Sequence, residues 1–174
     1  MSKVKFNLVG NTFTHLTNGN KGYSVHGKES KHIEWVGEDG EGTFYIDNTA
    51  KKGIIEKKDG PKYLWLLESR FIKPGMVESI IENREEIENA YEYIFTHDQR
   101  LLSLGDKYKW CPAQGFWIKD PKVYQKSKMI SMIASNKNMC EGHRLRLEWV
   151  DRIGDQLDLY DRGFKEIADK EEGL

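Results

Sequence analysis

Short apolar runs separated by polar, turn-rich segments recur along the first two thirds of the chain. Six of these runs have the length and composition of β-strands: residues 3–9, 31–36, 43–47, 63–67, 93–95 and 109–112. The run at 63–67 (YLWLL) is the most apolar of this half, which is typical of a central strand buried on both faces. Residues 76–91 instead repeat apolar side chains at helical spacing, and 99–104 predicts a shorter helix. This alternation of strands and helices predicts an α/β fold.

Three polar segments between these runs predict connections. The glycine-rich segment 37–42 (GEDGEG) lies between two predicted strands and predicts the turn of a β-hairpin. The charged, turn-rich segment 51–62 predicts a surface connection. The sequence predicts a long polar loop at residues 11–27, which includes His15 and His26. Loops of this length are often functional, although solvated surface histidines are the simpler interpretation.

A strand–loop–helix–strand unit is predicted in the last third of the chain, within residues 126–164. Its strand, polar turn, helix and second strand are expected at residues 129–134, 135–138, 141–153 and 157–160. The apolar stripe of the helix is expected to hold Leu145, Trp149, Val150 and Ile153. A polar loop that leads from a strand into a helix often holds phosphate, because free backbone N–H groups favour an anion there. The first turns of this helix also carry Arg144 and Arg146.

The composition is that of a polar but globular protein, with 38% hydrophobic and 32% charged residues. A length of 174 residues suits one domain, or one domain and part of a second. The net charge of −1 gives no overall field that attracts nucleic acid or a membrane surface. No apolar run approaches the ~18 residues of a membrane span. Without a secretory signal, Cys111 and Cys140 are expected to be reduced thiols of a cytoplasmic protein.

Several catalytic and metal-binding motifs do not occur in the sequence. The histidines show neither H-x-H nor H-E-x-x-H spacing, and there is no C-x-x-C or D-x-D sequence, so no metal site is implied. There is no P-loop and no G-x-G-x-x-G motif for a nucleotide. A serine hydrolase would need a nucleophile turn such as G-x-S-x-G, which is also missing.

The last third of the chain carries a recognisable order of motifs. An apolar strand ends in Ser135-Asn136, a short loop leads into a helix with arginines, and Leu-Asp-Leu-Tyr then precedes Arg162-Gly163. This order resembles the start of the nucleotide-sugar domain of the α1,3-fucosyltransferases, the family 10 glycosyltransferases. The family usually has glycine before the arginine of the closing turn, where this chain has Asp161.

In that family the helix arginine of this unit contacts the diphosphate of GDP-fucose. The resemblance implies this role for Arg146, which stands twelve residues before Asp158, with Arg144 as the second choice. Ser135 and Asn136 are expected to lend hydrogen bonds to the same phosphates. The residues alone leave alternatives open: a solvated helix arginine paired with Asp or Glu, and capping of the helix by Ser135 or Asn136.

The first half also resembles this family, in its acceptor-side domain. The motifs that carry the resemblance are Leu67-Glu68-Ser69, Thr96-His97-Asp98 and Cys111-Pro112-Ala113-Gln114-Gly115. In all, the resemblance covers roughly residues 63–164 and implies a Rossmann-like, GT-B-type glycosyltransferase architecture. Residues 1–123 would form the acceptor-side domain, and 124–174 the first strand–helix–strand of the donor domain. The family's later acidic-Asn and Tyr-x-Thr-Glu-Lys motifs do not occur, so the second domain is expected to be incomplete, in a short protein or a fragment.

The resemblance implies inverting transfer of fucose from GDP-fucose, the donor, to a hydroxyl group of a glycan acceptor, with no further cofactor. Such a transfer needs a carboxylate that takes the acceptor proton and positive groups that stabilise the leaving diphosphate. Glu68 is the candidate base, because it follows an apolar strand that can desolvate its carboxylate. The alternative for Glu68 is an ion pair with Arg70 or Lys73.

Two other functions stay open at the level of the sequence. The missing donor motifs favour a non-catalytic carbohydrate- or nucleotide-binding remnant. An incomplete second half also favours a Rossmann-like structural domain that self-associates as a homo-oligomer.

Overall fold

The computed structural model describes residues 2–10, 31–112, 123, 125, 129–160 and 165–166. The chain divides into two compact units, Met1–Gly115 and Phe116–Leu174, and each unit has its own sheet. The sequence pattern predicts the boundary after residue 123.

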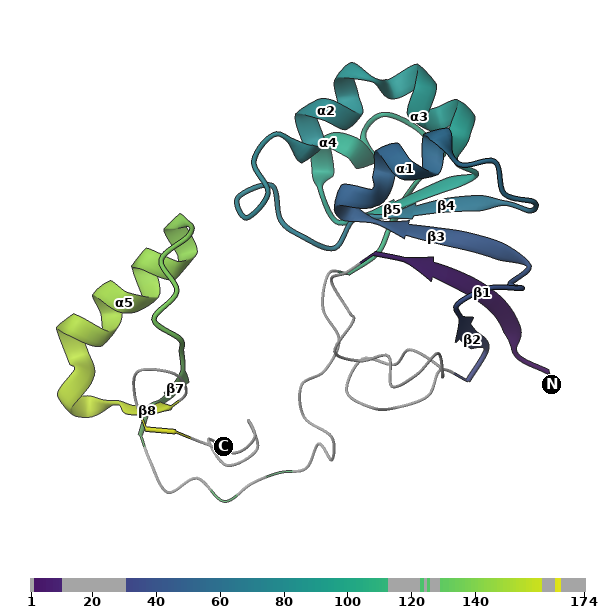
Figure 1. Ribbon diagram of the computed structural model, residues 1–174. Coiled ribbons are helices and arrows are strands. Elements are labelled where there is room, and N and C mark those ends of the chain that lie inside the picture. The colour runs from purple at the N-terminus through teal and green to yellow at the C-terminus, as the bar shows by residue number, and fades with distance from the viewer. Residues whose placement is uncertain are drawn as a thin grey trace. The chain divides into compact units, whose positions relative to one another are not determined.

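The first unit is built on a six-stranded sheet in which every neighbouring pair of strands is parallel (Figure 1). The strands are β1 (Val4–Val9), β2 (Ile33–Val36), β3 (Gly42–Ile46), β4 (Lys62–Trp65), β5 (Tyr93–Thr96) and β6 (Tyr108–Trp110). Across the sheet their order is β2-β1-β3-β4-β5-β6. All six predicted strands are present, the predicted α/β fold is confirmed, and the sheet is compatible with a Rossmann-like fold.

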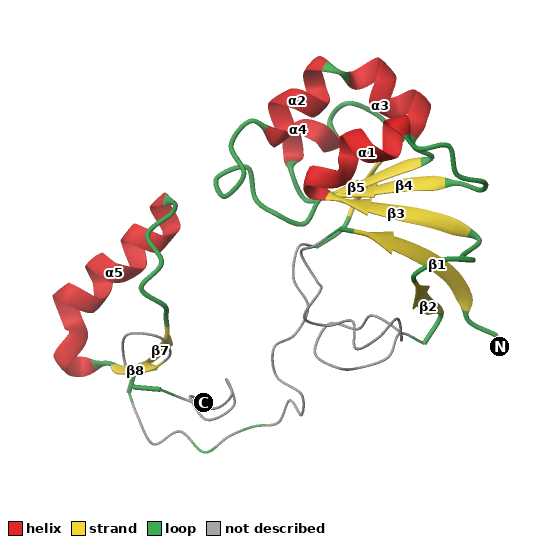
Figure 2. Cartoon of the chain, viewed as in Figure 1, coloured by secondary structure: helices red, strands yellow, loops and turns green. Residues whose placement is uncertain are grey.

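Helices cover one face of this sheet (Figures 1 and 2). Within the described residues they are α1 (Ala50–Ile55), α2 (Met76–Glu82), α3 (Arg84–Ala90) and α4 (Gln99–Leu102), with a 3₁₀ turn, η3 (Asp47–Thr49), before α1. The single helix predicted at 76–91 is two helices. Asn83, with φ −106° and ψ 30°, is the C-cap of α2 and the N-cap of α3, so the chain bends there.

Helix α1 lies where the sequence predicted a surface connection. Its charged residues and Gly53 make this helix hard to predict from the sequence. Glycine in a helix costs about 1 kcal/mol of free energy relative to alanine. A Cβ at Gly53 would lie 2.0 Å from the Tyr91 hydroxyl oxygen and 2.8 Å from Cγ of Tyr45. The Tyr91 hydroxyl donates a hydrogen bond to the carbonyl of Ala50 at 2.5 Å. Glycine therefore lets α1 approach the core, a requirement that helical periodicity does not reveal.

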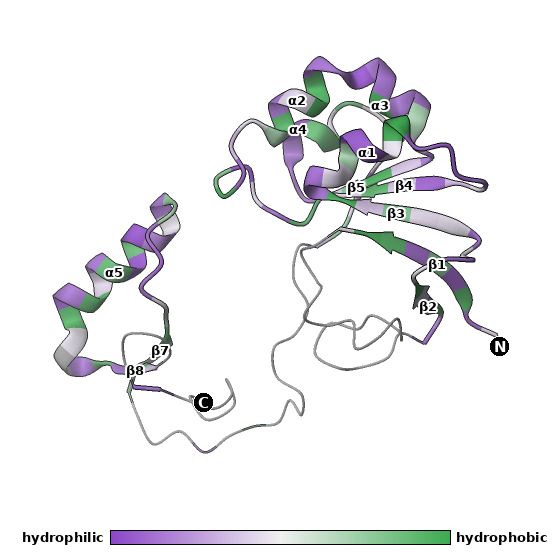
Figure 3. Ribbon diagram, in the orientation of Figure 1, coloured by the Kyte–Doolittle hydropathy of each residue, from purple (hydrophilic) through white to green (hydrophobic). Residues whose placement is uncertain are grey.

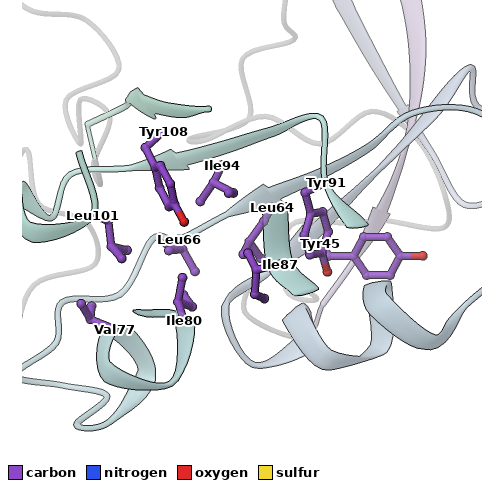
Figure 4. Close-up of a cluster of buried hydrophobic side chains, with 10 residues drawn as sticks. All are labelled: Tyr45, Leu64, Leu66, Val77, Ile80, Ile87, Tyr91, Ile94, Leu101 and Tyr108. Carbon is purple, nitrogen blue, oxygen red and sulfur yellow. The ribbon is translucent and has the colours of Figure 1, made fainter. Parts of the chain in front are cut away.

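The main hydrophobic core lies between these helices and the sheet (Figure 4). Its buried members are Tyr45, Leu64, Leu66, Val77, Ile80, Ile87, Tyr91, Ile94, Leu101 and Tyr108. Full burial of one such aliphatic side chain contributes roughly 1.5–3 kcal/mol. Strands β3, β4 and β5 each place side chains in this core, so it holds the three strands against the same helices.

Three tyrosines of the core should make the protein less stable in alkali. Burial is the largest cause that raises the pKa of Tyr45 and Tyr91 far above the ordinary 10.0 and the pKa of Tyr108 to about 12. As pH rises past 10, the unfolded chain loses these protons first, so stability present below pH 10 is lost toward about pH 12. The expected slope is about 1.4 kcal/mol per pH unit for each tyrosine. Urea unfolding between about pH 9 and 11 measures it, and a constant free energy of unfolding would contradict the burial of these hydroxyls.

The opposite face of the sheet carries a row of aromatic side chains. Neighbouring ring centroids lie 4.8 to 6.4 Å apart among Phe6, Trp35, Phe44, Tyr63, Trp65 and Phe95. Strand side chains alternate between the two faces, so β4 places Leu64 in the core and its aromatic neighbours on this second face. Burial of β4 on both faces was predicted and holds in part, since Leu64 is buried while Tyr63 and Trp65 are half-buried.

Strands β2 and β3 do not form the predicted hairpin. Strand β1 lies between them and pairs in parallel with both. Since β2 ends at the level of Asn7 and β3 begins at the level of Phe6, a short connection at 37–41 is enough to cross β1. The N–H of Gly40 donates to Oδ1 of Asn7 at 2.9 Å, and a Cβ at Gly40 would lie 2.5 Å from the backbone nitrogen of Asn7. Glycine here serves a close crossing of two backbone segments rather than a reversal of the chain.

Gly40→Ala is therefore expected to lower the free energy of unfolding by about 1–3 kcal/mol, because an added methyl group must displace backbone rather than a mobile side chain. Urea unfolding of the variant measures the loss. Glu38→Ala, which truncates an exposed side chain of the same connection, is the matched control and should stay within about 0.5 kcal/mol. Equal effects of the two changes would show that the crossing tolerates a side chain.

The second unit contains a parallel strand–helix–strand arrangement. Strand β7 (Ser131–Ile133) leads to α5 (Glu141–Ile153), a 3₁₀ turn η4 (Gly154–Gln156) and β8 (Asp158–Tyr160), which pairs in parallel with β7. The N–H of Ala134 donates to the carbonyl of Tyr160 at 3.0 Å and extends the pairing. The predicted unit is confirmed, and α5 has the predicted bounds.

The apolar stripe predicted for α5 is partly wrong. Leu145 and Trp149 are 52% and 45% exposed. The half-buried side of the helix instead holds His143, Arg146, Leu147, Val150 and Ile153. Figure 3 shows polar residues (purple) along much of α5 with apolar residues (green) between them, so hydropathy alone did not settle which side is buried. Among the helices that the structure describes, none is long and apolar enough to cross a membrane.

Candidate functional site

Polar side chains gather where β3, β4 and β5 end. Because the strands are parallel, their carboxyl ends lie at one edge of the sheet, the edge at which open α/β sheets bind ligands. The residues that follow these strands there are Asp47, Glu68, Arg70, Lys73, His97 and Asp98. This edge is the candidate site of the first unit.

Asp47 directly follows β3, is 1% exposed and has a positive φ of 43°. Its Oδ1 accepts the backbone N–H groups of Leu67 at 2.8 Å and Glu68 at 3.3 Å. Its Oδ2 lies 3.5 Å from Nζ of Lys73. Residues other than glycine rarely adopt a positive φ, and those that do often lie at functional sites, held by their surroundings. Asp47 thus fixes the backbone that carries Glu68.

The carboxylate of Glu68 is not neutralised by the cations that follow it in the sequence. Arg70 pairs with Asp98, with Nη1 3.0 Å from Oδ2, and Lys73 pairs with Asp47. Within the described residues the half-buried Glu68 carboxylate has no hydrogen bond or ion pair. The interpretation of Glu68 as an ion-pair partner of Arg70 or Lys73 is therefore wrong. Its role as a base stays a prediction.

His97 follows β5, the strand beside the one that leads to Glu68. Its Nδ1 is buried and has no hydrogen-bond partner among the described residues. The next residue, Asp98, is engaged, since it accepts the N–H of Arg100 at 2.9 Å and pairs with Arg70. A buried polar atom without a partner costs about 1–3 kcal/mol, which a ligand or water can restore. Sequence reasoning gave His97 no role, although its place at the end of a strand was a usable signal.

Two cavities open beside this edge and share Asn48 and Lys73. The first, of about 440 Å³, lies between α1 and the pair α2 and α3. The second, of about 640 Å³, lies at the ends of β1 and β3. Both volumes suit a small molecule. Glu68 lines neither cavity.

The other predicted site residues belong to the second unit, around the start of α5. Arg146 is half-buried, and its Nε is buried without a hydrogen-bond acceptor in the described part of the chain. Arg144 is exposed. Ser135 is half-buried and Asn136 is exposed, both in the loop between β7 and α5. The interpretation of Arg146 as a solvated arginine paired with a carboxylate therefore does not fit the described contacts.

Neither Ser135 nor Asn136 caps α5. The N-cap residue is Cys140, whose side chain makes no capping hydrogen bond. The N–H of Met139, the residue before the N-cap, donates to Nδ1 of His143 at 3.2 Å. The capping role considered for Ser135 and Asn136 is therefore wrong, and their hydrogen bonds to phosphate stay a prediction.

The described residues contain no group of three or more His, Cys, Asp or Glu side chains placed to hold a metal ion. Comparisons of the chain with models of protein families, with curated proteins and with solved structures gave no match.

Proposed function

We propose that the chain belongs to a GT-B-type glycosyltransferase that transfers fucose from GDP-fucose to a hydroxyl group of a glycan, with inversion at the sugar. The first unit would hold the acceptor, and the second would begin the donor domain. The observation that carries the proposal is that Nε of Arg146 is buried and has no hydrogen-bond acceptor among the described residues.

Arg146 lies on the half-buried side of α5, in the second turn of the helix. The helix itself follows a strand and a polar loop. Its Nε is buried without an acceptor in the described residues. Burial of a polar group without a hydrogen bond is costly, and the cost is greater when the group is charged. An anionic ligand removes this cost, and a diphosphate at the start of a helix is the anion that this kind of loop favours. Arg144, which is exposed, carries no such cost and is the weaker candidate.

The carboxylate of Glu68 supports the other part of the proposal, which is activation of the acceptor hydroxyl in the first unit. It is half-buried at the carboxyl edge of a parallel sheet, and its backbone is fixed by Asp47. No described cation neutralises it, so it can accept a proton. An all-parallel sheet in one unit and a parallel strand–helix–strand in the other are also what two Rossmann-like domains of a GT-B enzyme require.

The proposed reaction is a single displacement. The acceptor oxygen attacks C1 of fucose while Glu68 takes the hydroxyl proton. The bond from C1 to the diphosphate oxygen breaks, and GDP leaves with the electron pair. Arg146 stabilises the negative charge that develops on the diphosphate, aided by hydrogen bonds from Ser135 and Asn136.

Calorimetry with GDP tests the donor site in the chain as it stands. We expect weak binding that falls as salt is added, because exposed charges on the phosphate are screened. Arg146→Ala should weaken it roughly tenfold to a hundredfold, the loss of one charge-assisted contact. Arg144→Ala removes the same charge two residues away and is the matched control, expected to change affinity less than threefold.

Equal losses in the two arginine variants would reduce the effect to general charge attraction and overturn the assignment of Arg146. Tight binding that ignores salt would mean that the donor site is more complete than proposed. GDP binding that depends on Arg146 without any fucose transfer by the protein would favour the non-catalytic, nucleotide-binding alternative.

A further inference from the structure

The larger cavity lies at the point where the strand order of the sheet reverses. From β1 the chain passes to β2 on one side, and from β3 it passes to β4 on the other, although β1 and β3 are neighbours (Figure 1). In open α/β sheets this switch point leaves a crevice outside the carboxyl ends of the two strands, and ligands bind there. The cavity of about 640 Å³ occupies this place, beside Val9, Gly10 and Ile46.

The charged side chains that line this cavity are lysines. They are Lys52, Lys58 and Lys73. The carboxylates that offset them lie outside the lining: Glu56 is 3.3 Å from Lys52, and Asp47 is 3.5 Å from Lys73. Three ammonium groups therefore face two carboxylates, and the excess is positive on the cavity side.

Of the three lysines, Lys58 has the fewest described contacts. It is exposed and makes no hydrogen bond or ion pair within the part of the chain that the structure describes. The pKa of Glu56 is lowered first by the hydrogen bond from Tyr45, then by Lys52, and least by Lys58. Lys58 is therefore close to one carboxylate but not held by it, and its ammonium group can turn to a ligand.

Part of the cavity wall is backbone, and one side chain joins the ends of the two strands beside it. Gly10 and Gly37 line it with backbone alone. The hydroxyl of Thr49 accepts the N–H of Ile46 at 2.7 Å and lies 3.0 Å from the carbonyl of Val9, which joins the ends of β1 and β3. Asn48 also lines the cavity, is exposed, and has no side-chain hydrogen bond among the described residues.

We propose that this cavity binds a small phosphate monoester of about the size of a sugar phosphate. The phosphate would lie among Lys52, Lys58 and Lys73, which act as point charges for a dianion. The amide of Asn48 and the backbone at Gly10 and Gly37 would face the uncharged part of the ligand. All residues of this site belong to the first unit, whereas Arg146 belongs to the second, and the proposal does not depend on the proposed glycosyl transfer.

Titration of the ¹⁵N-labelled chain, followed by NMR at low salt, tests the site with three probes: inorganic phosphate, a hexose 6-phosphate and the uncharged hexose. Both phosphates should shift the amide signals of Val9, Gly10, Gly37, Asn48 and Thr49. The hexose phosphate should bind more tightly than phosphate alone, because the cavity is larger than one phosphate, and the hexose alone should cause no shift. Signals that move only in the second unit, or not at all, would overturn the proposal. Equal affinity for both phosphates would mean that the cavity recognises the phosphate group alone, and would contradict the proposed size of the ligand.

Lys58→Gln and Lys57→Gln form a matched pair for this test. Both lysines are exposed and adjacent, but only Lys58 lines the cavity. Lys58→Gln should weaken the hexose phosphate roughly three- to tenfold, and Lys57→Gln less than twofold. Equal losses would mean attraction to the surface charge alone and would overturn the proposal. Arg146→Ala should leave the affinity for the hexose phosphate unchanged. A failure of the phosphate-site proposal can therefore be distinguished from a failure of the proposed donor site.

Discussion

Replacement of Glu68 by glutamine is expected to lower fucose transfer by roughly 10²–10⁴-fold, the usual contribution of a positioned acid or base. Glutamine keeps the size and hydrogen-bonding capacity of the side chain but cannot take the acceptor proton. The described contacts of Glu68 involve its backbone N–H rather than its carboxylate. The change should therefore leave folding intact. Transfer is measured as GDP released from GDP-fucose by the protein in the presence of a glycan acceptor.

The affinity for GDP separates this role from donor binding. It should hardly change in Glu68→Gln, because the diphosphate is assigned to Arg146 in the other unit. Glu85→Gln makes the same chemical change on the exposed side of α3 and should keep full activity. Near-normal turnover of Glu68→Gln would remove Glu68 from the mechanism. A fall of several degrees in melting temperature would instead indicate that the Glu68 carboxylate has a structural role.

The elements predicted correctly from the sequence are those in which the pattern of apolar and polar residues matches the burial of the element's own side chains. The six strands of the first sheet carry apolar or aromatic side chains, some in the core and some in the aromatic row of the other face, and the runs were visible in the sequence. Helix α5 was bounded by its polar loop and by Gly154, so its ends were predictable. These signals are local, and each element satisfies them by itself.

The elements predicted wrongly depend on contacts between distant segments. Gly40 and Gly53 look like turn or helix-breaking residues, yet each is required by one close approach, to β1 and to Tyr91. The hairpin prediction failed because strand order is not encoded in the length of the connection 37–41. The exposed side of α5 was misjudged because Leu145 and Trp149 are apolar without being covered.

The candidate site was predictable only in part for the same reason. Glu68 could be placed at a strand end from the run before it. Asp47 and His97 were not singled out, because their importance arises from burial and from partners far along the chain. The charge state of the site also depends on such partners: Arg70 and Lys73 were available in sequence to Glu68, but they pair with Asp98 and Asp47.

Asp47→Ala is expected to cause the largest loss of stability, about 3–5 kcal/mol in the free energy of unfolding. The change removes the acceptor for the N–H groups of Leu67 and Glu68 and leaves Lys73 without its buried partner. It also places alanine at a positive φ of 43°, which only short polar residues and glycine adopt easily. Since Lys73 is 25% exposed and can turn to water, the loss should lie toward the lower end of this range. Urea unfolding measures it.

Asp47→Asn separates the charge of Asp47 from its backbone contacts. Asparagine tolerates the positive φ and keeps an oxygen for the N–H of Leu67, but it does not attract Lys73. The loss in Asp47→Asn should therefore be smaller than in Asp47→Ala, and most of it should vanish when Lys73→Met is added, because the charge left unpaired is then removed. Amide exchange at Leu67 and Glu68 should be faster in Asp47→Ala than in Asp47→Asn. If the two variants exchange alike at these amides, the carboxylate of Asp47 does not hold the loop, and the positioning of Glu68 must come from elsewhere.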